Sequence, residues 1–278
     1  MNALEIIKFG SNLLKEKNIP SNILDSEILL SKILNKSREQ VLANLNQRIS
    51  KKNTLAFKKY LERRSKNEPM AYILEEKEFW SKKFNVCKNT LIPRPETELL
   101  VDKIIKLYKG KKISILDIGT GSGCIIISLL SCLKGSNGTG VDISKNAILT
   151  AKKNALLHKL DKIKFLHKSF DNIFGKKFDL IVSNPPYIER KDIKNLCDDI
   201  KKYEPRVALD GGNDGLDLIK KVIYKSKDIL KIKGTLALEI GNEQIKKVSK
   251  ILLDNNFKIK HVIKDYKNNI RCILAYYK

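Results

Sequence analysis

The chain has 278 residues, of which 42% are hydrophobic, enough to bury one or two full cores; this excludes a small disulfide-bonded scaffold and a disordered tail. Basic side chains outnumber acidic ones by 55 to 31, which gives a formal net charge of +24. The longest apolar run, residues 124–133, is about half of what a membrane-spanning helix needs, and the first residues lack the pattern of a signal peptide.

The cysteines and histidines indicate neither disulfides nor a metal centre. Five cysteines are scattered along the chain without a CxxC pair, so we expect reduced thiols and a cytoplasmic protein. His158, His167 and His261 do not stand at ligand spacing to cysteine or to one another, so no metal site is predicted.

The net positive charge fits two interpretations. A nucleic-acid-binding surface would concentrate Lys and Arg in one part of the chain. Residues 1–85 hold 17 basic and 10 acidic side chains, and the two parts of the chain, at +7 and +17, are almost equally basic per residue. Only 8 of the basic residues are Arg. We therefore favour a compositional bias toward Lys and expect no membrane and no specific nucleic acid as partner, although diffuse charge attracts polyanions.

Residues 1–66 are predicted to form helices. Leu4, Ile7 and Leu14 recur at three-to-four spacing, and apolar residues continue this spacing from 23 to 34. The sequence SREQ at 37–40 has the form of a capping box for a third helix, and Ser50 opens a fourth. Taken alone, this pattern predicts a small helical bundle with no chemistry of its own.

Residues 67–95 are predicted to be a structured linker. Glu68 and Pro69 end the helical pattern, and 78–80 and 84–86 are expected to form two short strands. The sequence PRP at 93–95 then fixes an extended turn before a helix that begins near Glu96. A flexible linker would instead be rich in Gly and Ser.

From residue 111 onward, apolar runs alternate with helical stretches. The runs lie at 113–118, 138–143, 163–167, 178–183 and 234–240, and residues 257–263 and 270–276 are expected to form a final hairpin. Such alternation predicts an α/β fold with a parallel sheet covered by helices on both faces. Ligands of such sheets bind at the carboxyl ends of the strands, so the chemistry is expected there.

A glycine-rich loop follows the first of these strands. It reads Asp117-Ile118-Gly119-Thr120-Gly121-Ser122-Gly123. Glycines let a ligand lie against bare backbone, and the start of the next helix offers free N–H groups to an anion. The spacing is not that of a dinucleotide fingerprint, because position 126 is Ile, nor that of a Walker A loop, because no Lys-Ser/Thr pair follows.

Two carboxylates narrow the ligand of this loop. Asp117 is expected to point into the pocket, where it suits a cationic group and would repel a pyrophosphate. Asp142 closes the second strand, where a carboxylate can accept both hydroxyls of a ribose. S-adenosylmethionine is a nucleoside with an ammonium and a sulfonium and fits both. The alternative is a glycine turn in an ordinary α/β protein, which the two acids make the weaker interpretation.

A second motif, Asn184-Pro185-Pro186-Tyr187, follows the strand at 178–183. The prolines remove two N–H donors, so the loop offers only carbonyl acceptors, to which the side-chain oxygen of Asn184 adds another. These acceptors suit the two hydrogens of a planar NH2 group, whose flat face Tyr187 can cover. Holding both hydrogens directs the nitrogen lone pair toward a sulfonium methyl group, so catalysis is expected to be orientation and electrostatics. The alternative is a proline turn that closes a strand.

These motifs together resemble a class I S-adenosylmethionine-dependent methyltransferase that acts on an NH2 group. Further segments narrow the likeness, namely EPMAYIL at 68–74, EFW at 78–80, IPRPETE at 92–98 and YEPRVALDGG at 203–212. They resemble the HemK/PrmC family, which methylates the glutamine of the Gly-Gly-Gln tripeptide in peptide chain release factors. The likeness covers nearly the whole chain.

The resemblance implies a Rossmann-like domain with a mostly parallel seven-stranded sheet at 96–278, a hairpin linker at 67–95 and a helical bundle at 1–66 that docks the release factor. It implies that S-adenosylmethionine is held by the residues Asp117, Gly119, Thr120, Gly121, Ser122, Gly123, Asp142, Phe170 and Asn184. Asn184, Pro185, Pro186 and Tyr187 would bind the glutamine amide and perform the catalysis.

The chain departs from the family pattern at four places. The sequence KSF at 168–170 lacks the acid that commonly precedes the aromatic residue beside the adenine. Glu75 and Ser81 replace glycines, so the hairpin near 75–81 is expected to turn differently. The glycine usual between Asp265 and Arg271 is also absent.

Three alternatives remain open from the sequence. Adenine also presents NH2 on a flat ring, so an N6-adenine methyltransferase of DNA or RNA is the main one. Carboxylates of 94–98 and 204–212 are expected around the entrance, where they would oppose phosphates. The other two are a glutamine methyltransferase of a ribosomal protein and an inactive binding module, which is disfavoured because every residue the transfer needs is present.

Overall fold

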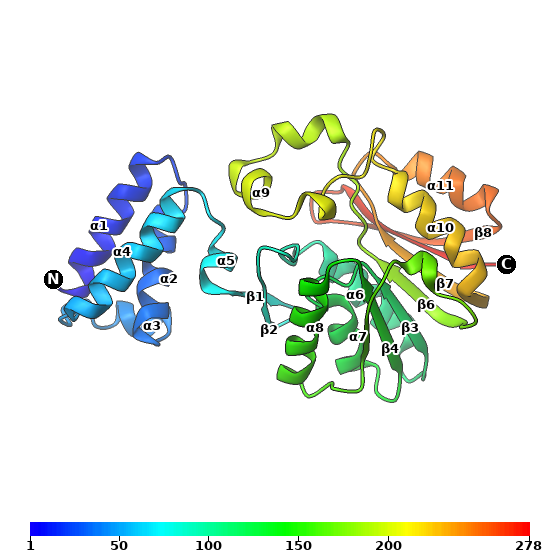
Figure 1. The fold of residues 1–278 in the computed structure, drawn as a ribbon, viewed down its shortest axis with the longest axis horizontal. Helices are drawn as coiled ribbons and strands as arrows, with labels where there is room; N and C mark the ends of the chain where they lie inside the picture. The colour runs from blue at the N-terminus through cyan, green and yellow to red at the C-terminus, as the bar shows by residue number, and fades with distance from the viewer. The chain divides into compact units, whose positions relative to one another are not determined.

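A computed structural model describes residues 1–278, and the chain divides into two compact units (Figure 1). One unit comprises residues 1–76 and 197–203, and the other comprises 77–196 and 204–278. No helix in either unit has both the length and the apolar character needed to cross a lipid bilayer.

The first unit is helical, as the sequence predicts. Its helices are α1 (Ala3–Glu16), α2 (Asn22–Leu34), α3 (Arg38–Leu42), α4 (Lys51–Ser65), α5 (Met70–Leu74) and α9 (Asp198–Tyr203). The predicted capping box at α3 is present, because the Ser37 and Gln40 side chains each accept the other's backbone N–H. Two of the helices were not predicted: α5 begins directly after Pro69, where we expected the helical pattern to end, and α9 lies far along the chain.

Close helix packing forms the core of this unit. Gly10 on α1 is buried, and a Cβ atom at this position would lie 2.6 Å from Phe57 Cζ on α4 and 2.9 Å from Ser26 Oγ on α2. The missing side chain therefore lets three helices meet around Phe57, Leu29 and Leu61, which are all almost fully buried.

The second unit contains a seven-stranded sheet in the order β5-β4-β3-β6-β7-β9-β8. The strands are β3 (Ser114–Ile118), β4 (Asn137–Asp142), β5 (Lys164–His167), β6 (Phe178–Ser183), β7 (Leu230–Glu239), β8 (Phe257–Lys264) and β9 (Ile270–Tyr277). Pairing is parallel from β5 to β7, and β9 pairs antiparallel with both β7 and β8. This confirms the predicted strands, the mostly parallel sheet and the final hairpin.

Helices cover both faces of the sheet (Figure 1). On one face lie α6 (Thr97–Tyr108), α7 (Cys124–Cys132) and α8 (Lys145–Leu157), and on the other lie α10 (Asp217–Ile229) and α11 (Ile245–Asp254). Side chains alternate along each strand, so Leu180 and Val182 join the first core while Ile181 joins the second. Burial on both faces explains why these strands read as continuous apolar runs.

The departures from the family's glycines do not remove the turns. The strands β1 (Glu76–Phe79) and β2 (Lys82–Asn85) pair through a two-residue turn in which Trp80 and Ser81 both have φ 53°. Glu75, at the end of α5, has φ 61°. Positive φ at both turn positions is what a type I′ hairpin needs. The chain adopts this conformation, which glycine favours, with side chains that disfavour it.

Candidate active site

The two predicted motifs leave the sheet side by side. β3 pairs with β4 on one side and with β6 on the other, so the connections that follow β3 and β6 diverge at this point. Ile118 is the register partner of Ser183, and the Ser183 hydroxyl donates to the Ile118 carbonyl at 2.8 Å. The loops that start at Gly119 and Asn184 therefore emerge together at the carboxyl edge, where an open α/β sheet binds its ligands.

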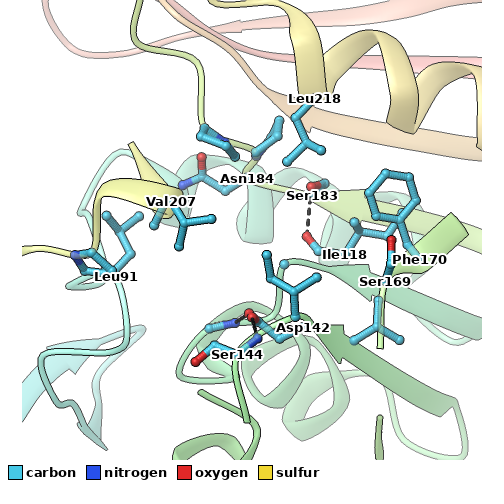
Figure 2. A pocket seen from close by; sticks show the side chains of 18 of the residues that line it. Leu91, Ile118, Asp142, Ser144, Ser169, Phe170, Ser183, Asn184, Val207 and Leu218 are labelled. Carbon is cyan, nitrogen blue, oxygen red and sulfur yellow. Dashed lines mark hydrogen bonds between the residues drawn. The ribbon is translucent and has the colours of Figure 1, made fainter. Parts of the chain in front are cut away.

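A pocket of about 380 Å³ opens at this edge, which lies in the range of small-molecule sites (Figure 2). The predicted residues that line it are Gly119, Gly121, Asp142, Phe170, Asn184, Pro185 and Pro186. In the close view, Asn184 and Asp142 lie on opposite sides of the pocket, and Phe170 lies on a third. Asp117, Thr120, Ser122, Gly123 and Tyr187 are not among the lining residues.

Asp117 lies beneath the glycine loop rather than pointing into the pocket. Its side chain is fully buried, Oδ2 accepts the Thr120 hydroxyl at 2.7 Å, and Oδ1 has no hydrogen-bond partner of normal geometry. Burial raises the pKa of Asp117 from 3.8 to about 7; the Thr120 hydrogen bond opposes the shift, and the charge of Asp142 adds to it. A buried carboxylate oxygen without a partner suits a cationic group of a ligand, because no side-chain cation balances it.

The glycines of the loop keep its backbone accessible. Gly119 has φ 70° and Gly121 has φ 55°, and a Cβ atom at Gly119 would meet nothing within 4 Å. Gly123 serves packing instead, because a Cβ atom there would lie 3.0 Å from the Ile127 side chain of α7. Gly119 and Gly121 therefore leave room for a ligand, whereas Gly123 allows close contact with α7.

Asp142 is held in place by backbone donors. Its Oδ2 accepts the Gly121 N–H at 2.9 Å and its Oδ1 accepts the Ser144 N–H at 2.8 Å. Each carboxylate oxygen keeps a second lone pair, which is available to hydroxyl groups of a ligand. Burial raises the pKa of Asp142, and these two N–H groups oppose that shift.

Phe170 and Ser169 follow β5 at the pocket wall. Phe170 is buried and opens the short 3₁₀ turn η1 (Phe170–Asn172). At the position of the missing acid, the Ser169 hydroxyl accepts the Asp171 N–H and donates to the Asp171 carboxylate at 2.9 Å. Asp171 also lines the pocket, so a carboxylate is present one residue after the aromatic ring.

The Asn184 amide has a defined orientation. Its Nδ2 donates to Thr97 Oγ1 at 3.2 Å, and the Thr97 hydroxyl donates to Glu239 Oε2 at 2.6 Å. Because Nδ2 is turned toward Thr97, the acceptor oxygen Oδ1 is left for the pocket that Asn184 lines. The side chain is thereby presented as an acceptor.

Tyr187 and the carbonyls behind the loop are braced by other segments. The Tyr187 hydroxyl points at Glu239 Oε1, 3.4 Å away, and its carbonyl accepts Gln244 Nε2 at 3.0 Å. A Cβ atom at Gly215 would lie 2.5 Å from the Tyr187 carbonyl, and one at Gly211 would lie 2.9 Å from the Pro186 carbonyl. Bare backbone from 211–215 therefore packs directly against the second motif.

The expected ring of carboxylates at the entrance is wrong for Glu204. Its side chain is buried, where it accepts Arg94 Nη2 and the Ile92 N–H, so it is neutralised rather than exposed. Charged residues of both signs line the pocket, namely Lys168, Arg190, Lys221, Asp142, Asp171, Asp210 and Asp217. The charge at the entrance therefore gives no argument against a phosphate-bearing substrate.

Sequence analysis missed three residues of this site. Thr97 and Glu239 orient Asn184, and Gln244 holds the Tyr187 carbonyl. Thr97 lies within the IPRPETE segment, which carried the resemblance without a role for each position. No pattern in the sequence marked Glu239 or Gln244, because their partners are 52 to 142 residues away.

Two family models match the chain. Residues 5–74 match the model of the PrmC N-terminal domain, and residues 95–203 match that of the methyltransferase small domain. In solved structures, a ribosomal protein L11 methylase from Lactobacillus delbrueckii subsp. bulgaricus superposes with a TM-score of 0.51 at 20% identity, over 66% of this chain and 81% of that one. That likeness concerns the fold.

Curated relatives match over nearly the whole length. The release factor glutamine methyltransferase of Fusobacterium nucleatum is 39% identical, over 98% of this chain and 78% of that protein. The protein of the same name from Clostridium acetobutylicum is also 39% identical, over 95% of this chain and 94% of its own length. Both likenesses span the helical unit, the glycine loop and the Asn184 motif, and the chain therefore belongs to the release factor glutamine methyltransferase family.

Proposed function

We propose that this enzyme transfers a methyl group from S-adenosylmethionine to the side-chain amide nitrogen of the glutamine in the Gly-Gly-Gln motif of peptide chain release factors. The observation that carries the proposal is the oriented Asn184 amide, whose Nδ2 is tied to Thr97 so that an acceptor faces the pocket. An acceptor pair built from this oxygen and the proline carbonyls matches a primary amide, which presents two hydrogens in one plane.

The residues around the pocket fit the cofactor. Asp142 would accept the ribose hydroxyls, Phe170 would pack against the adenine, and the unpartnered Oδ1 of Asp117 would attract the ammonium group. Gly119 and Gly121 would leave room for the chain between them. When bound, S-adenosylmethionine supplies an electrophilic methyl group on a sulfonium. The positive charge of the cofactor complements Asp117, the buried acid beneath the glycine loop.

Catalysis then consists of holding the amide. Asn184 Oδ1 and a carbonyl of the proline loop accept its two hydrogens, which concentrates electron density on the nitrogen and aligns its lone pair. The nitrogen gains the methyl group and loses one proton, which leaves to water. No side chain has to remove that proton beforehand, because the acceptors already stabilise the developing N–H charge.

Methyl labelling tests this function directly. The protein is incubated with methyl-labelled S-adenosylmethionine and, separately, with release factors, ribosomal proteins and DNA, and the label is located by mass spectrometry. We expect it on the glutamine of Gly-Gly-Gln. Label on adenine alone would refute the assignment, and label on a ribosomal glutamine alone would move it to the alternative substrate.

The helical unit is proposed to contact the release factor around the glutamine-bearing loop. On its surface, Lys58 Nζ lies 5.6 Å from the centre of the Phe9 ring, which joins the outer sides of α1 and α4. Leu55 is 61% exposed and stands three residues before Lys58, so it shares that side of α4. An apolar group beside a cation suits a protein partner.

Substitution of Leu55 by serine tests this docking without removing any segment. We expect kcat/KM for the intact release factor to fall by about 10-fold, because a buried leucine contributes roughly 1.5 kcal/mol or more at an interface. The rate with a free Gly-Gly-Gln peptide should stay unchanged. Leu156→Ser, at an exposed leucine of α8, is the matched control. Equal losses on both substrates would contradict the docking role.

A further inference from the structure

We infer that Thr97 and Glu239 form a directional relay that fixes which atom of the Asn184 amide faces the substrate. The two are positioning residues, since they act through Asn184 and line no part of the pocket. The inference rests on the proposed function. It adds the groups that make Asn184 an acceptor for the NH2 group of the substrate amide.

The relay is buried and continuous. Thr97 is 2% exposed at the first turn of α6, and Glu239 is 1% exposed at the end of β7. The Thr97 hydroxyl lies 2.6 Å from Glu239 Oε2 and 3.2 Å from Asn184 Nδ2. The Thr97 and Glu239 side chains are buried, so protein groups must satisfy their hydrogen-bonding capacity, and the second carboxylate oxygen of Glu239, Oε1, faces the Tyr187 hydroxyl at 3.4 Å.

An ionised Glu239 sets the direction of both hydrogen bonds in the relay. A carboxylate only accepts, so the single proton of the Thr97 hydroxyl is committed to it. Thr97 Oγ1 is then left with lone pairs, and these can meet Asn184 only through its NH2 group. Oδ1 must therefore face the pocket, where it accepts a hydrogen of the substrate amide.

A protonated Glu239 removes this constraint. Its own hydroxyl can donate to Thr97, and the freed Thr97 proton can donate to Asn184 Oδ1, which allows the amide to rotate by 180°. The NH2 group would then face the pocket and oppose the NH2 group of the substrate. Two donors that face each other lose the hydrogen bond and leave both groups unsatisfied.

The surroundings of Glu239 place this change near neutral pH. Burial raises the pKa of Glu239 from 4.5 to about 7, while Thr97 and Tyr187 lower it through hydrogen bonds. Glu96 raises the value and Arg271 lowers it. The other titratable groups nearby stay neutral, because burial also raises the pKa of the thiols of Cys124 and Cys272 and of the Tyr187 phenol.

Two substitutions at Thr97 separate the relay from simple packing. Thr97→Val keeps the shape but removes the hydroxyl, and we expect kcat/KM for the release factor to fall by about 10- to 100-fold, with the dissociation constant of S-adenosylmethionine unchanged. Thr97→Ser restores the hydroxyl and should stay within about three-fold of the wild type. Thr235→Val is the matched control, since this buried threonine of β7 bonds the Tyr108 hydroxyl instead.

The pH profile tests the direction of the relay. At saturating cofactor, the wild-type kcat/KM should rise with pH and level off above about 7. Glu239→Gln cannot ionise, so its profile should be flat through that window. The ¹H–¹⁵N resonance of the Asn184 side chain, identified by its loss in Asn184→Ala, should titrate in the wild type and not in Glu239→Gln.

The outcomes are distinct. If Thr97→Val matches the wild type or Thr235→Val, or if Glu239→Gln keeps the wild-type pH profile, the relay is refuted while methylation by the wild type still stands. If the wild type does not methylate the release factor, the proposed function fails, and the Asn184 resonance still decides whether the relay exists.

Discussion

Replacing Asn184 with alanine is expected to lower kcat for methylation of the release factor by about 10²- to 10³-fold, the usual effect of removing one preorganised polar group that stabilises charge in a transition state. The loss has two sources. Oδ1 no longer accepts an amide hydrogen, and the substrate nitrogen is no longer held in line. Labelled-methyl transfer at saturating cofactor measures the change.

Binding of S-adenosylmethionine should survive that substitution. Apart from Asn184 itself, the groups expected to hold the cofactor come from β3, β4, η1 and the glycine loop, and Asn184 lies across the pocket from Asp142, so most of the cofactor contacts are kept (Figure 2). Calorimetry should give a dissociation constant within a few-fold of the wild type. Asn195→Ala, at an exposed asparagine in the same connection between β6 and β7, serves as control. An Asn184→Ala enzyme that retains more than a tenth of the wild-type kcat would contradict the role of the amide.

Neutralising the acid beneath the glycine loop should have the second largest effect. Asp117→Asn keeps the shape and the Thr120 hydrogen bond but removes the charge that faces no partner at Oδ1. We expect the dissociation constant of S-adenosylmethionine to rise by about 10- to 100-fold, because a buried charge pair loses one partner. S-adenosylmethionine titrations of both proteins measure this change.

The same substitution should stabilise the ligand-free protein above neutral pH. The pKa of Asp117 is raised from 3.8 to about 7, so folding favours the protonated form. The stability that this proton provides is complete below pH 4, falls as the pH rises from about 4 to 7, and is absent above 7. The loss is on the order of 4 kcal/mol, at about 1.4 kcal/mol for each pKa unit.

Thermal unfolding without ligand measures that difference. Asp117→Asn should melt above the wild type at pH 8 and show no such gain at pH 4. Asp161→Asn, which removes an exposed charge, should show neither effect. If Asp117→Asn binds S-adenosylmethionine as tightly as the wild type does, Asp117 does not interact with the cofactor cation.

The sheet could be predicted because its determinants are local. A strand buried on both faces needs an apolar side chain at nearly every position, and residues 178–183 meet this demand without help from distant residues. The rule that connections diverge beside a central strand then puts the two motifs at one edge, which the pairing of Ile118 with Ser183 confirms.

The inner side of the site could not be predicted, because its contacts join distant parts of the chain. Thr97 and Glu239 are 142 residues apart, and Asn184 is 87 residues from Thr97. Glu204 illustrates the same limit. As a charged residue in a loop it was expected to be exposed, and only the fold shows Arg94 beside it. Residue type alone does not reveal whether a charge faces solvent or a partner.

At the positions that lack the family's glycines, the location of the turn could be predicted but its backbone conformation could not. Besides Ser81 and Glu75, which have positive φ, Asn268 adopts φ 63° between Asp265 and Arg271. There the Asp265 carboxylate accepts the backbone N–H groups of Lys267 and Asn269. Such local bonds compensate for part of the conformational cost that a glycine would avoid.

The segment that contains α9 has a consequence for how the protein acquires its structure. Because residues 197–203 belong with the helices while 196 and 204 belong with the sheet, the backbone passes between the two units three times. The Tyr203 hydroxyl donates to the Lys66 carbonyl at the end of α4, so α9 contacts a residue that is synthesised 137 residues earlier. On the ribosome, the helical bundle therefore emerges long before its final piece, and its assembly is finished only after the Asn184 loop has been made.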